Sequence, residues 1–302
     1  MEPSGVLIVN KPEGMTSHDV VAVMRRLFST RKVGHTGTLD PMATGVLPIL
    51  IGRAAKAAEY LSSDTKEYIA TLRLGTTYDT EDVTGTPIKV SENIPDSEKV
   101  FEVIKSFIGE QKQIPPMYSA LKVNGQKLCD LARKGIEIER EARSITIYSI
   151  DAKKGDSPTD YILSVKCSSG TYIRTLCVDI GEALGCGGAM ATLCRSKAGE
   201  FPLESSYTIE ALKEMTLEER YALLLPTEEL FSELSPIYLP AFYEKLSRNG
   251  CEIYLKKIGL DLPLGERVRL YSQSKKFYAL GEVKEYESGK AIKIIKLFDI
   301  ES

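Results

Sequence analysis

The segment at positions 34–45, GHTGTLDPMATG, gathers three glycines, three threonines, a histidine and a proline around one carboxylate, Asp40. An aspartate before proline in such a segment often bonds to its own backbone and shapes a turn. A phosphate cradle of backbone amides is a poor alternative, because the segment matches neither Gly-x-x-x-x-Gly-Lys-Ser/Thr nor Gly-x-Gly-x-x-Gly. The third interpretation is a catalytic carboxylate.

A lone catalytic acid would restrict the reaction. Hydrolysis of an ordinary glycoside uses two carboxyl groups, because the leaving alkoxide must be protonated while the anomeric carbon is attacked. One acid is enough when the leaving group is already a tolerable anion, as uracil is, since its charge spreads over two carbonyls. An ionised Asp40 could then act at C1′ of a uridine with neither metal nor cofactor.

Length and composition limit the class of protein. A chain of 302 residues, of which 43% are hydrophobic, has room for two domains with real cores. It has no run of about eighteen apolar residues and no secretory signal pattern at its N-terminus, so we expect a cytoplasmic protein without a membrane span. Six cysteines without a Cys-x-x-Cys pair, beside two histidines, argue against zinc and for free thiols. No metal or cofactor is therefore expected.

The charge distribution leaves nucleic acid open as a partner. The net formal charge is −3, but residues 204–233 hold eight acids against two bases, which leaves the rest of the chain at +3. Bases also occur as adjacent pairs, such as Arg25 with Arg26 and Arg133 with Lys134. Such pairs usually just solvate a surface, yet a basic face on a mildly acidic protein fits this pattern.

Predicted elements on both sides of Asp40 would position it. Residues 5–12, GVLIVNKP, are typical of a strand that ends at proline. Residues 17–28 have apolar side chains at helical spacing, and Ser17 can cap that helix. Residues 66–75 alternate, which places on one side of a strand Tyr68, Ala70, Leu72 and Leu74. Residues 171–188 begin extended and become a helix that ends at glycines.

The chain changes character after about residue 200. Asn124-Gly125 predicts a hairpin turn before that point, and Thr208 and Thr216 can each cap a short helix after it. Pro236 and Pro240 mark a boundary, beyond which short strands alternate with turn signals. We predict an α+β fold, with a large mixed β-sheet flanked by helices in residues 1–235 and a small β-rich domain in residues 236–302.

Several blocks of the sequence, in the same order, resemble the bacterial TruB family, which makes pseudouridine in the T loop of transfer RNA. They are GHTGTLDPMATGVLPILIGRAAK, NKPEGMTS, KEYIATLRLG, TYDTEDVTG, IPPMYSALKVNGQKLCDLARKG, SSGTYIRTLCVDIGEALGCGG and ATLCRSKAGEF. Many ordered blocks over roughly the first 200 residues are far more specific than a lone GTLD. The resemblance implies isomerisation of uridine 55 of tRNA without a cofactor, and the tail is similar to a PUA-type RNA-binding module.

Three catalytic residues follow from this resemblance. Asp40 would attack C1′ of the target uridine or stabilise the charge there, after which the uracil detaches, turns and rejoins through C5. Arg174 would pair with Asp40 and lower its pKa, so that the carboxylate stays ionised. Tyr68 would stack on the flipped uracil, and the alternative role of packing in the core can hold at the same time.

The resemblance also implies substrate-binding residues, each with a structural alternative. Tyr172 and Leu193 would line the pocket, although both have an equally plausible role in the core. His35 would insert where the target base leaves the stack, or else bond the backbone of its loop. Lys11 is placed with them as a support of the loop, and Asp82 as a positional residue.

Transfer RNA is a folded polyanion, so phosphate contacts should dominate its affinity. About half of six basic candidates are expected to touch RNA, namely Lys122, Lys127, Arg133, Lys134, Arg195 and Lys197. We expect a monomer that acts on the T-arm of tRNA without an obligate protein partner. Two alternatives stay open, a guide-RNA-dependent pseudouridine synthase with small partner proteins and a tRNA-folding chaperone without chemistry.

Overall fold

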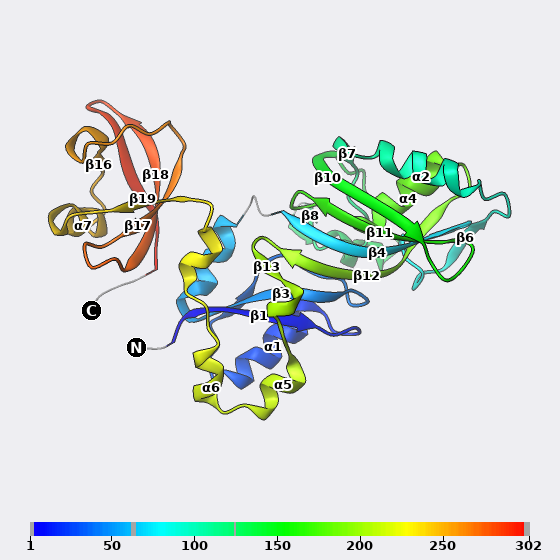
Figure 1. Cartoon of the computed structure of the whole chain (residues 1–302), viewed down its shortest axis with the longest axis horizontal. Helices are drawn as coiled ribbons and strands as arrows, with labels where there is room; N and C mark the ends of the chain where they lie inside the picture. Colours follow the sequence, from blue (N-terminus) through cyan, green and yellow to red (C-terminus); the bar gives the residue numbers. More distant parts are fainter. Residues whose placement is uncertain (1–2, 62–64, 124, 299–302) are drawn as a thin grey trace.

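The computed structural model describes residues 3–61, 65–123 and 125–298, which form a ten-stranded mixed sheet with helices and a separate five-stranded sheet (Figure 1). The predicted class, a large mixed sheet flanked by helices and followed by a β-rich tail, is confirmed. The five-stranded sheet begins at Ser235. No helix in these ranges is long and apolar enough to cross a membrane.

The large sheet runs in the order β14-β1-β3-β12-β4-β11-β10-β7, with β13 paired to β12 and β2 paired to β3. The pairs β1 with β14 and β3 with β12 are parallel, and the other pairs are antiparallel. Its strands are β1 (Gly5–Lys11), β2 (Val33–His35), β3 (Thr44–Ile51), β4 (Lys66–Leu74), β7 (Gly109–Gln113), β10 (Arg143–Lys154), β11 (Asp160–Cys167), β12 (Gly188–Ala198), β13 (Phe201–Pro202) and β14 (Tyr207–Thr208).

Two small hairpins stand off this sheet. One pairs β5 (Thr76–Tyr78) with β6 (Pro87–Val90), and the other pairs β8 (Lys122–Val123) with β9 (Gln126–Lys127). A turn was predicted at Asn124-Gly125, between β8 and β9, but Asn124 lies outside the described residues.

The helices of the large unit are α1 (Ser17–Leu27), α2 (Ser97–Ser106), α3 (Leu128–Ala132), α4 (Ile173–Ala183), α5 (Ile209–Glu214) and α6 (Leu217–Ala222), with 3-10 turns η1 (Gly52–Tyr60), η2 (Leu203–Ser205) and η3 (Thr227–Phe231). Thr208 and Thr216 cap α5 and α6 as predicted. The cap of α1 was predicted one residue too late. Thr16 accepts from the Asp19 amide in a capping box, which frees Ser17 for another contact.

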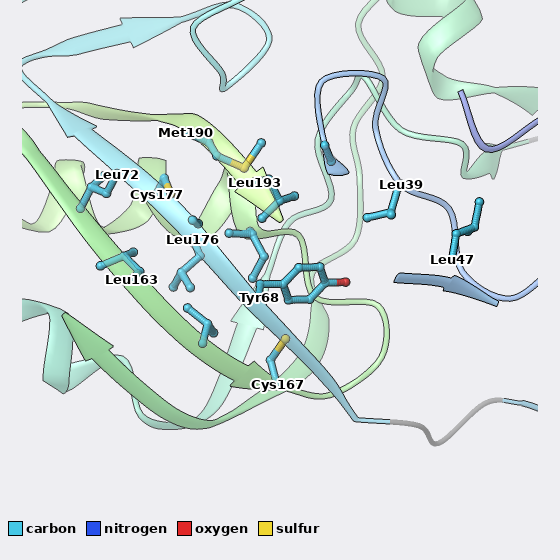
Figure 2. Close-up of a cluster of buried hydrophobic side chains, with 14 of the residues drawn as sticks. Leu39, Leu47, Tyr68, Leu72, Leu163, Cys167, Leu176, Cys177, Met190 and Leu193 are labelled. Carbon is cyan, nitrogen blue, oxygen red and sulfur yellow. The ribbon is translucent and has the colours of Figure 1, made fainter. Parts of the chain in front are cut away.

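Successive side chains along the strands of the large sheet point to opposite faces, so the hydrophobic core is divided into one cluster on each face. In β1, Leu7 and Val9 join the cluster that contains α1 and α4, while Val6 and Ile8 face the opposite side, toward η1 and η3. The predicted face of β4 is buried as expected, from Tyr68 through Leu74. Figure 2 shows Tyr68 at the edge of this core, with its hydroxyl directed toward the segment that carries Leu39.

The tail folds as a sheet in the order β15-β17-β18-β19-β16. Its elements are β15 (Ser235–Tyr238), α7 (Ala241–Arg248), β16 (Ile253–Tyr254), η4 (Leu255–Lys257), β17 (Arg267–Tyr271), β18 (Phe277–Tyr286) and β19 (Gly289–Leu297). The sequence did not predict α7, and β16, the strand that follows it, is only two residues long before the chain turns into η4. Three rings, Phe231, Phe277 and Phe298, pack together and join the tail to the face of β1 and β3 that carries Val6.

Candidate active site

Asp40 lies in the loop between β2 and β3, and contacts with the start of α1 fix this loop. The buried Ser17 hydroxyl accepts a hydrogen bond from the Leu39 amide at 2.9 Å and lies 3.2 Å from the Leu39 carbonyl. The Gly14 amide donates to the Pro41 carbonyl at 2.8 Å. Both neighbours of Asp40 are therefore tied to α1 and its approach, which leaves the carboxylate little freedom of position.

Lys11, the last residue of β1, also supports the loop that carries Asp40. Its fully buried ammonium donates to three carbonyls, those of Pro12, Met15 and Pro41, at 2.9, 2.6 and 3.1 Å. Burial lowers its pKa to about 8, while the Asp40 and Glu13 carboxylates oppose that shift. The supporting role agrees with expectation. Lys11 is not among the residues that line the Asp40 cavity, and its assignment as a substrate-binding residue stays a prediction.

Arg174 forms a two-point ion pair with Asp40. The side chain is 4% exposed, and its Nε lies 2.9 Å from Asp40 Oδ2 while Nη2 lies 3.3 Å from Oδ1. The guanidinium also donates to the Tyr118 carbonyl at 2.8 Å and to the Thr80 carbonyl at 3.0 Å. The expected ion pair is present, and a guanidinium held at this many points offers Asp40 a rigid partner.

A second buried carboxylate lies behind the guanidinium. Asp82 Oδ2 is 3.7 Å from Arg174 Nη1, and its Oδ1 accepts from the Thr80 hydroxyl, the Thr84 amide and the Thr84 hydroxyl. The aspartate is 5% exposed. Asp82 therefore holds the Arg174 guanidinium through Nη1, a different nitrogen from those that contact Asp40. This contact is consistent with the positional role expected for Asp82.

The start of α4 places Arg174 and Tyr172. Tyr172 is the N-cap residue of α4, and among the described residues no side-chain cap from Tyr172 itself is found. Instead the buried side chain of Gln113, at the end of β7, accepts from the Tyr172 amide at 2.8 Å and donates to its carbonyl at 3.0 Å. Gln113 was not predicted as a site residue, because its partner lies 59 positions away in the chain.

Burial raises the pKa of Asp40 above the ordinary value of 3.8. The Arg174 guanidinium acts in the opposite direction, and the Asp82 carboxylate adds to the increase. The predicted net lowering of this pKa is therefore wrong in direction, because the cost of desolvating the carboxylate outweighs the attraction of its cation.

Asp40 opens into a cavity of about 340 Å³. Its side chain keeps 33% of its surface accessible there. The walls include the expected Tyr68, Tyr172, Arg174 and Leu193. Tyr68 and Leu193 belong at the same time to the large hydrophobic core, so a place in the cavity wall is compatible with a packing role.

Arg195 belongs to this cavity and not to an exposed basic surface. It is 1% exposed, and its guanidinium donates from Nε to the Val46 carbonyl at 2.7 Å and from Nη2 to the Gly37 carbonyl at 3.2 Å. Its inclusion among surface phosphate contacts is therefore wrong. The strand pairing explains the difference, since Arg195 lies opposite both Tyr68 and Gly45 in the interior of the sheet.

Gly45, in β3 just after the Asp40 loop, lies so close to the backbone of β12 that a side chain does not fit between them. Its φ is +101°, and a Cβ there would lie 2.3 Å from the Arg195 carbonyl oxygen. Any other residue would force β3 and β12 apart next to the cleft.

His35 lies in β2 beside His18, with ring centroids 5.6 Å apart and the rings nearly perpendicular. Its Nδ1 is buried and meets no hydrogen-bond partner among the described residues. Burial lowers the pKa of His35, and neighbouring His18 and Arg195 add to this effect. The imidazole is not among the residues lining the Asp40 cavity.

The remaining basic candidates are dispersed. Arg133 and Lys134 are exposed just after α3, and Lys197 is half-buried with its ammonium 3.8 Å from Glu200. Lys122 and Lys127 lie opposite each other in the β8–β9 hairpin, next to the cleft residues Ala120 and Leu121, but their side chains lie outside the described part of the structure. Within the described ranges, no group of three or more His, Cys, Asp or Glu side chains converges as metal ligands.

The fold of this chain is similar to that of chains in solved structures of Cbf5 complexes. The chain superposes with a TM-score of 0.71 on a chain of a Cbf5–Nop10–Gar1 complex, at 26% identity over 98% of this chain and 85% of that one. It matches a chain of the archaeal box H/ACA sRNP Nop10–Cbf5 complex with a TM-score of 0.72 at 25% identity, over 99% and 87%.

The sequence comparisons define the class of protein as pseudouridylate synthases. Residues 25–173 match the TruB family pseudouridylate synthase N-terminal domain, and residues 174–232 match the tRNA pseudouridylate synthase B C-terminal domain. Proteins named tRNA pseudouridine synthase B are 45% identical in Alkaliphilus oremlandii, over 97% of this chain and 98% of that protein, and 43% identical in Francisella tularensis subsp. novicida, over 98% and 95%. The chain belongs to the TruB family, as the sequence resemblance predicted.

Proposed function

We propose that this protein is an isomerase that converts uridine 55 in the T loop of tRNA to pseudouridine, with Asp40 as its one catalytic carboxylate. The observation that carries the proposal is the ion pair of Asp40 and Arg174 at a nucleoside-sized opening. The names of the relatives, tRNA pseudouridine synthase B, support tRNA as the substrate.

In the proposed reaction, the ionised Asp40 acts at C1′ of a uridine that has left the base stack. The bond from C1′ to N1 breaks and its electron pair stays on the uracil, which turns and bonds to C1′ through C5. The C5 proton is lost to water and N1 gains a proton, so the product is an isomer. Tyr68 would pack against the ring, and Leu193 and Tyr172 would complete the walls.

The rest of the molecule would bind the folded RNA. Exposed bases near the cleft, among them Arg133 and Lys134, would contact phosphates without reading sequence. We assign residues 1–235 to the catalytic domain and 236–302 to a PUA-like RNA-binding domain. The whole would act as a cytoplasmic monomer on the T-arm, without an obligate protein partner. The named relatives favour this over a guide-RNA-dependent enzyme.

Release of a label from C5 tests the proposed function. Purified protein, without guide RNA or added metal, is mixed with unmodified tRNA tritiated at C5 of uridine. The expected result is transfer of tritium to water, because C5 exchanges its hydrogen for the new glycosidic bond. Tight tRNA binding without release of tritium would instead support the chaperone alternative, and release that requires a guide RNA would support the guided enzyme.

The rate of this reaction is expected to fall in acid with an apparent pKa above 3.8, the ordinary value for aspartate. The active form is the carboxylate, so activity is complete above the raised pKa of Asp40 and is lost as the pH falls through it. Single-turnover rates with saturating protein measure this limb directly. Asp82→Asn removes a neighbour that raises the pKa, so it should move the limb to lower pH. A shift to higher pH would contradict the assignment.

A further inference from the structure

Ser119 is a buried polar residue at the cleft for which the sequence analysis assigned no role. It is 5% exposed, and its Oγ has less than 1 Å² of accessible surface. Among the described residues this oxygen meets no hydrogen-bond partner. The Tyr172 phenol is its polar neighbour: burial raises the pKa of Tyr172, and the approach of the Ser119 hydroxyl opposes that rise, but the two hydroxyls fall outside hydrogen-bond geometry.

Ser119 differs in its location from other residues that carry an unsatisfied buried polar atom. Ser119 lines the cavity that holds Asp40, whereas His35 and Arg140, which also carry such atoms, do not. A buried hydroxyl without a partner destabilises the folded protein, since it has given up its bond to water. An unsatisfied group of this kind in a native fold calls for an explanation, and a ligand that completes the bond is one.

The backbone holds Ser119 next to the reacting centre. The carbonyl of its neighbour Tyr118 accepts from Arg174 Nη2 at 2.8 Å, and that same nitrogen contacts Asp40. The Ser119 carbonyl accepts from the Cys129 amide at 3.1 Å, which ties the segment to α3. The hydroxyl therefore belongs to a segment fixed on both sides and anchored to the catalytic ion pair.

We propose that the Ser119 hydroxyl is a substrate-contacting residue that hydrogen-bonds an oxygen next to C1′ of the target nucleoside. This inference rests on the proposed function, which places C1′ at Asp40. Two candidate oxygens lie near C1′: the ribose 2′-hydroxyl, on the carbon bonded to C1′, and the uracil O2, on the carbon bonded to N1. A serine hydroxyl can donate to either, and the tests below distinguish them.

Paired serine variants test the contact. Ser119→Ala should lower the single-turnover rate or weaken RNA binding by roughly 5- to 30-fold, the size expected for one buried hydrogen bond. It should not lower the melting temperature, because the free protein loses no hydrogen bond. The control is Ser247→Ala in the tail, whose equally buried hydroxyl bonds the Glu244 carbonyl and the Tyr278 hydroxyl at 2.8 and 2.9 Å. That change should lower the melting temperature and leave the chemistry unchanged.

Modified RNAs identify the contacted oxygen. Dissociation constants are measured in an Asp40→Asn background, which prevents turnover, for tRNA carrying uridine, 2′-deoxyuridine or 2-thiouridine at the target. Ser119→Ala should weaken binding of the uridine form and have no effect with one analogue, since that analogue already lacks the partner. Loss of the effect with 2′-deoxyuridine assigns the ribose, and loss with 2-thiouridine assigns the base.

Failure of this inference differs from failure of the proposed function. If wild-type protein releases no tritium, the proposed function is wrong, whatever Ser119 does. If wild-type protein is active and Ser119→Ala matches it in rate and in affinity, the Ser119 contact is overturned. An undiminished effect with both analogues, or a melting temperature lowered as much as by Ser247→Ala, also overturns it, because the hydroxyl would then act within the protein.

Discussion

Asp40→Asn should slow tritium release from C5-labelled tRNA by a factor on the order of 10⁴ or more, because loss of the proposed catalytic carboxylate leaves only binding and positioning. The same change should not weaken the fold. Burial raises the pKa of Asp40, which means that the native environment disfavours its charge. The neutral isostere removes that cost, and Arg174 keeps Asp82 and the carbonyls of Thr80 and Tyr118 as partners. The melting temperature should therefore stay equal or rise, as is common where a site is arranged for activity at the expense of stability.

The measurement combines single-turnover kinetics, tRNA binding and thermal unfolding on the same preparation. Asp261→Asn is the matched control, since it makes the same chemical change at an exposed tail carboxylate paired with Lys290. It should leave all three measurements unchanged. Full turnover by Asp40→Asn would end the proposed mechanism. Loss of turnover together with loss of folding would show that the aspartate is structural, as its position before a proline first allowed.

Arg174→Met should abolish turnover and also destabilise the protein by about 3–5 kcal/mol, the usual result of removing one partner from a buried ion pair. The change strands two carboxylates, Asp40 and Asp82, and leaves the carbonyls of Thr80 and Tyr118 without their donor. Denaturant unfolding gives the stability, and tritium release gives the rate. The two losses should occur together, in contrast to Asp40→Asn, where only the rate falls.

Two further variants sharpen this test. Arg267→Met breaks a half-exposed pair with Glu282 at 3.4 Å and should cost only about 0–1 kcal/mol. Arg174→Lys keeps the charge but cannot reproduce a planar fork that reaches two aspartates and two carbonyls, so it should recover part of the stability and little of the rate. A stability loss for Arg174→Met no larger than for Arg267→Met would contradict the buried network.

Local patterns were enough to predict the framework of the site. The alternation in β4 placed Tyr68 on a buried face, the ordered motifs placed Arg174 at the start of a helix, and threonine caps located α5 and α6. These features depend on residues a few positions apart. The β-rich tail also followed from local signals, although α7 was missed because Pro236 and Pro240 were interpreted only as a boundary and not as the approach to a helix.

What sequence could not supply came from contacts between distant segments. Arg195 looks like a surface base in ATLCRSKAGEF, and only the pairing of β12 with both β3 and β4 buries it. Gln113 is unremarkable until it contacts Tyr172. The direction of the Asp40 pKa shift depends on how much water the folded loop excludes, and a pairwise argument from Arg174 alone does not contain that quantity.

The aromatic cluster of Phe231, Phe277 and Phe298 has a consequence for how large ligands meet this protein. Because these rings are shared between the tail and the buried side of β1 and β3, the tail cannot swing without exposing apolar surface to water. The tail and the cleft therefore keep a fixed position relative to each other, and do not behave as two domains joined by a flexible linker. A ligand that touches both must already hold the matching shape, so rigidity in the ligand itself becomes a criterion of selection.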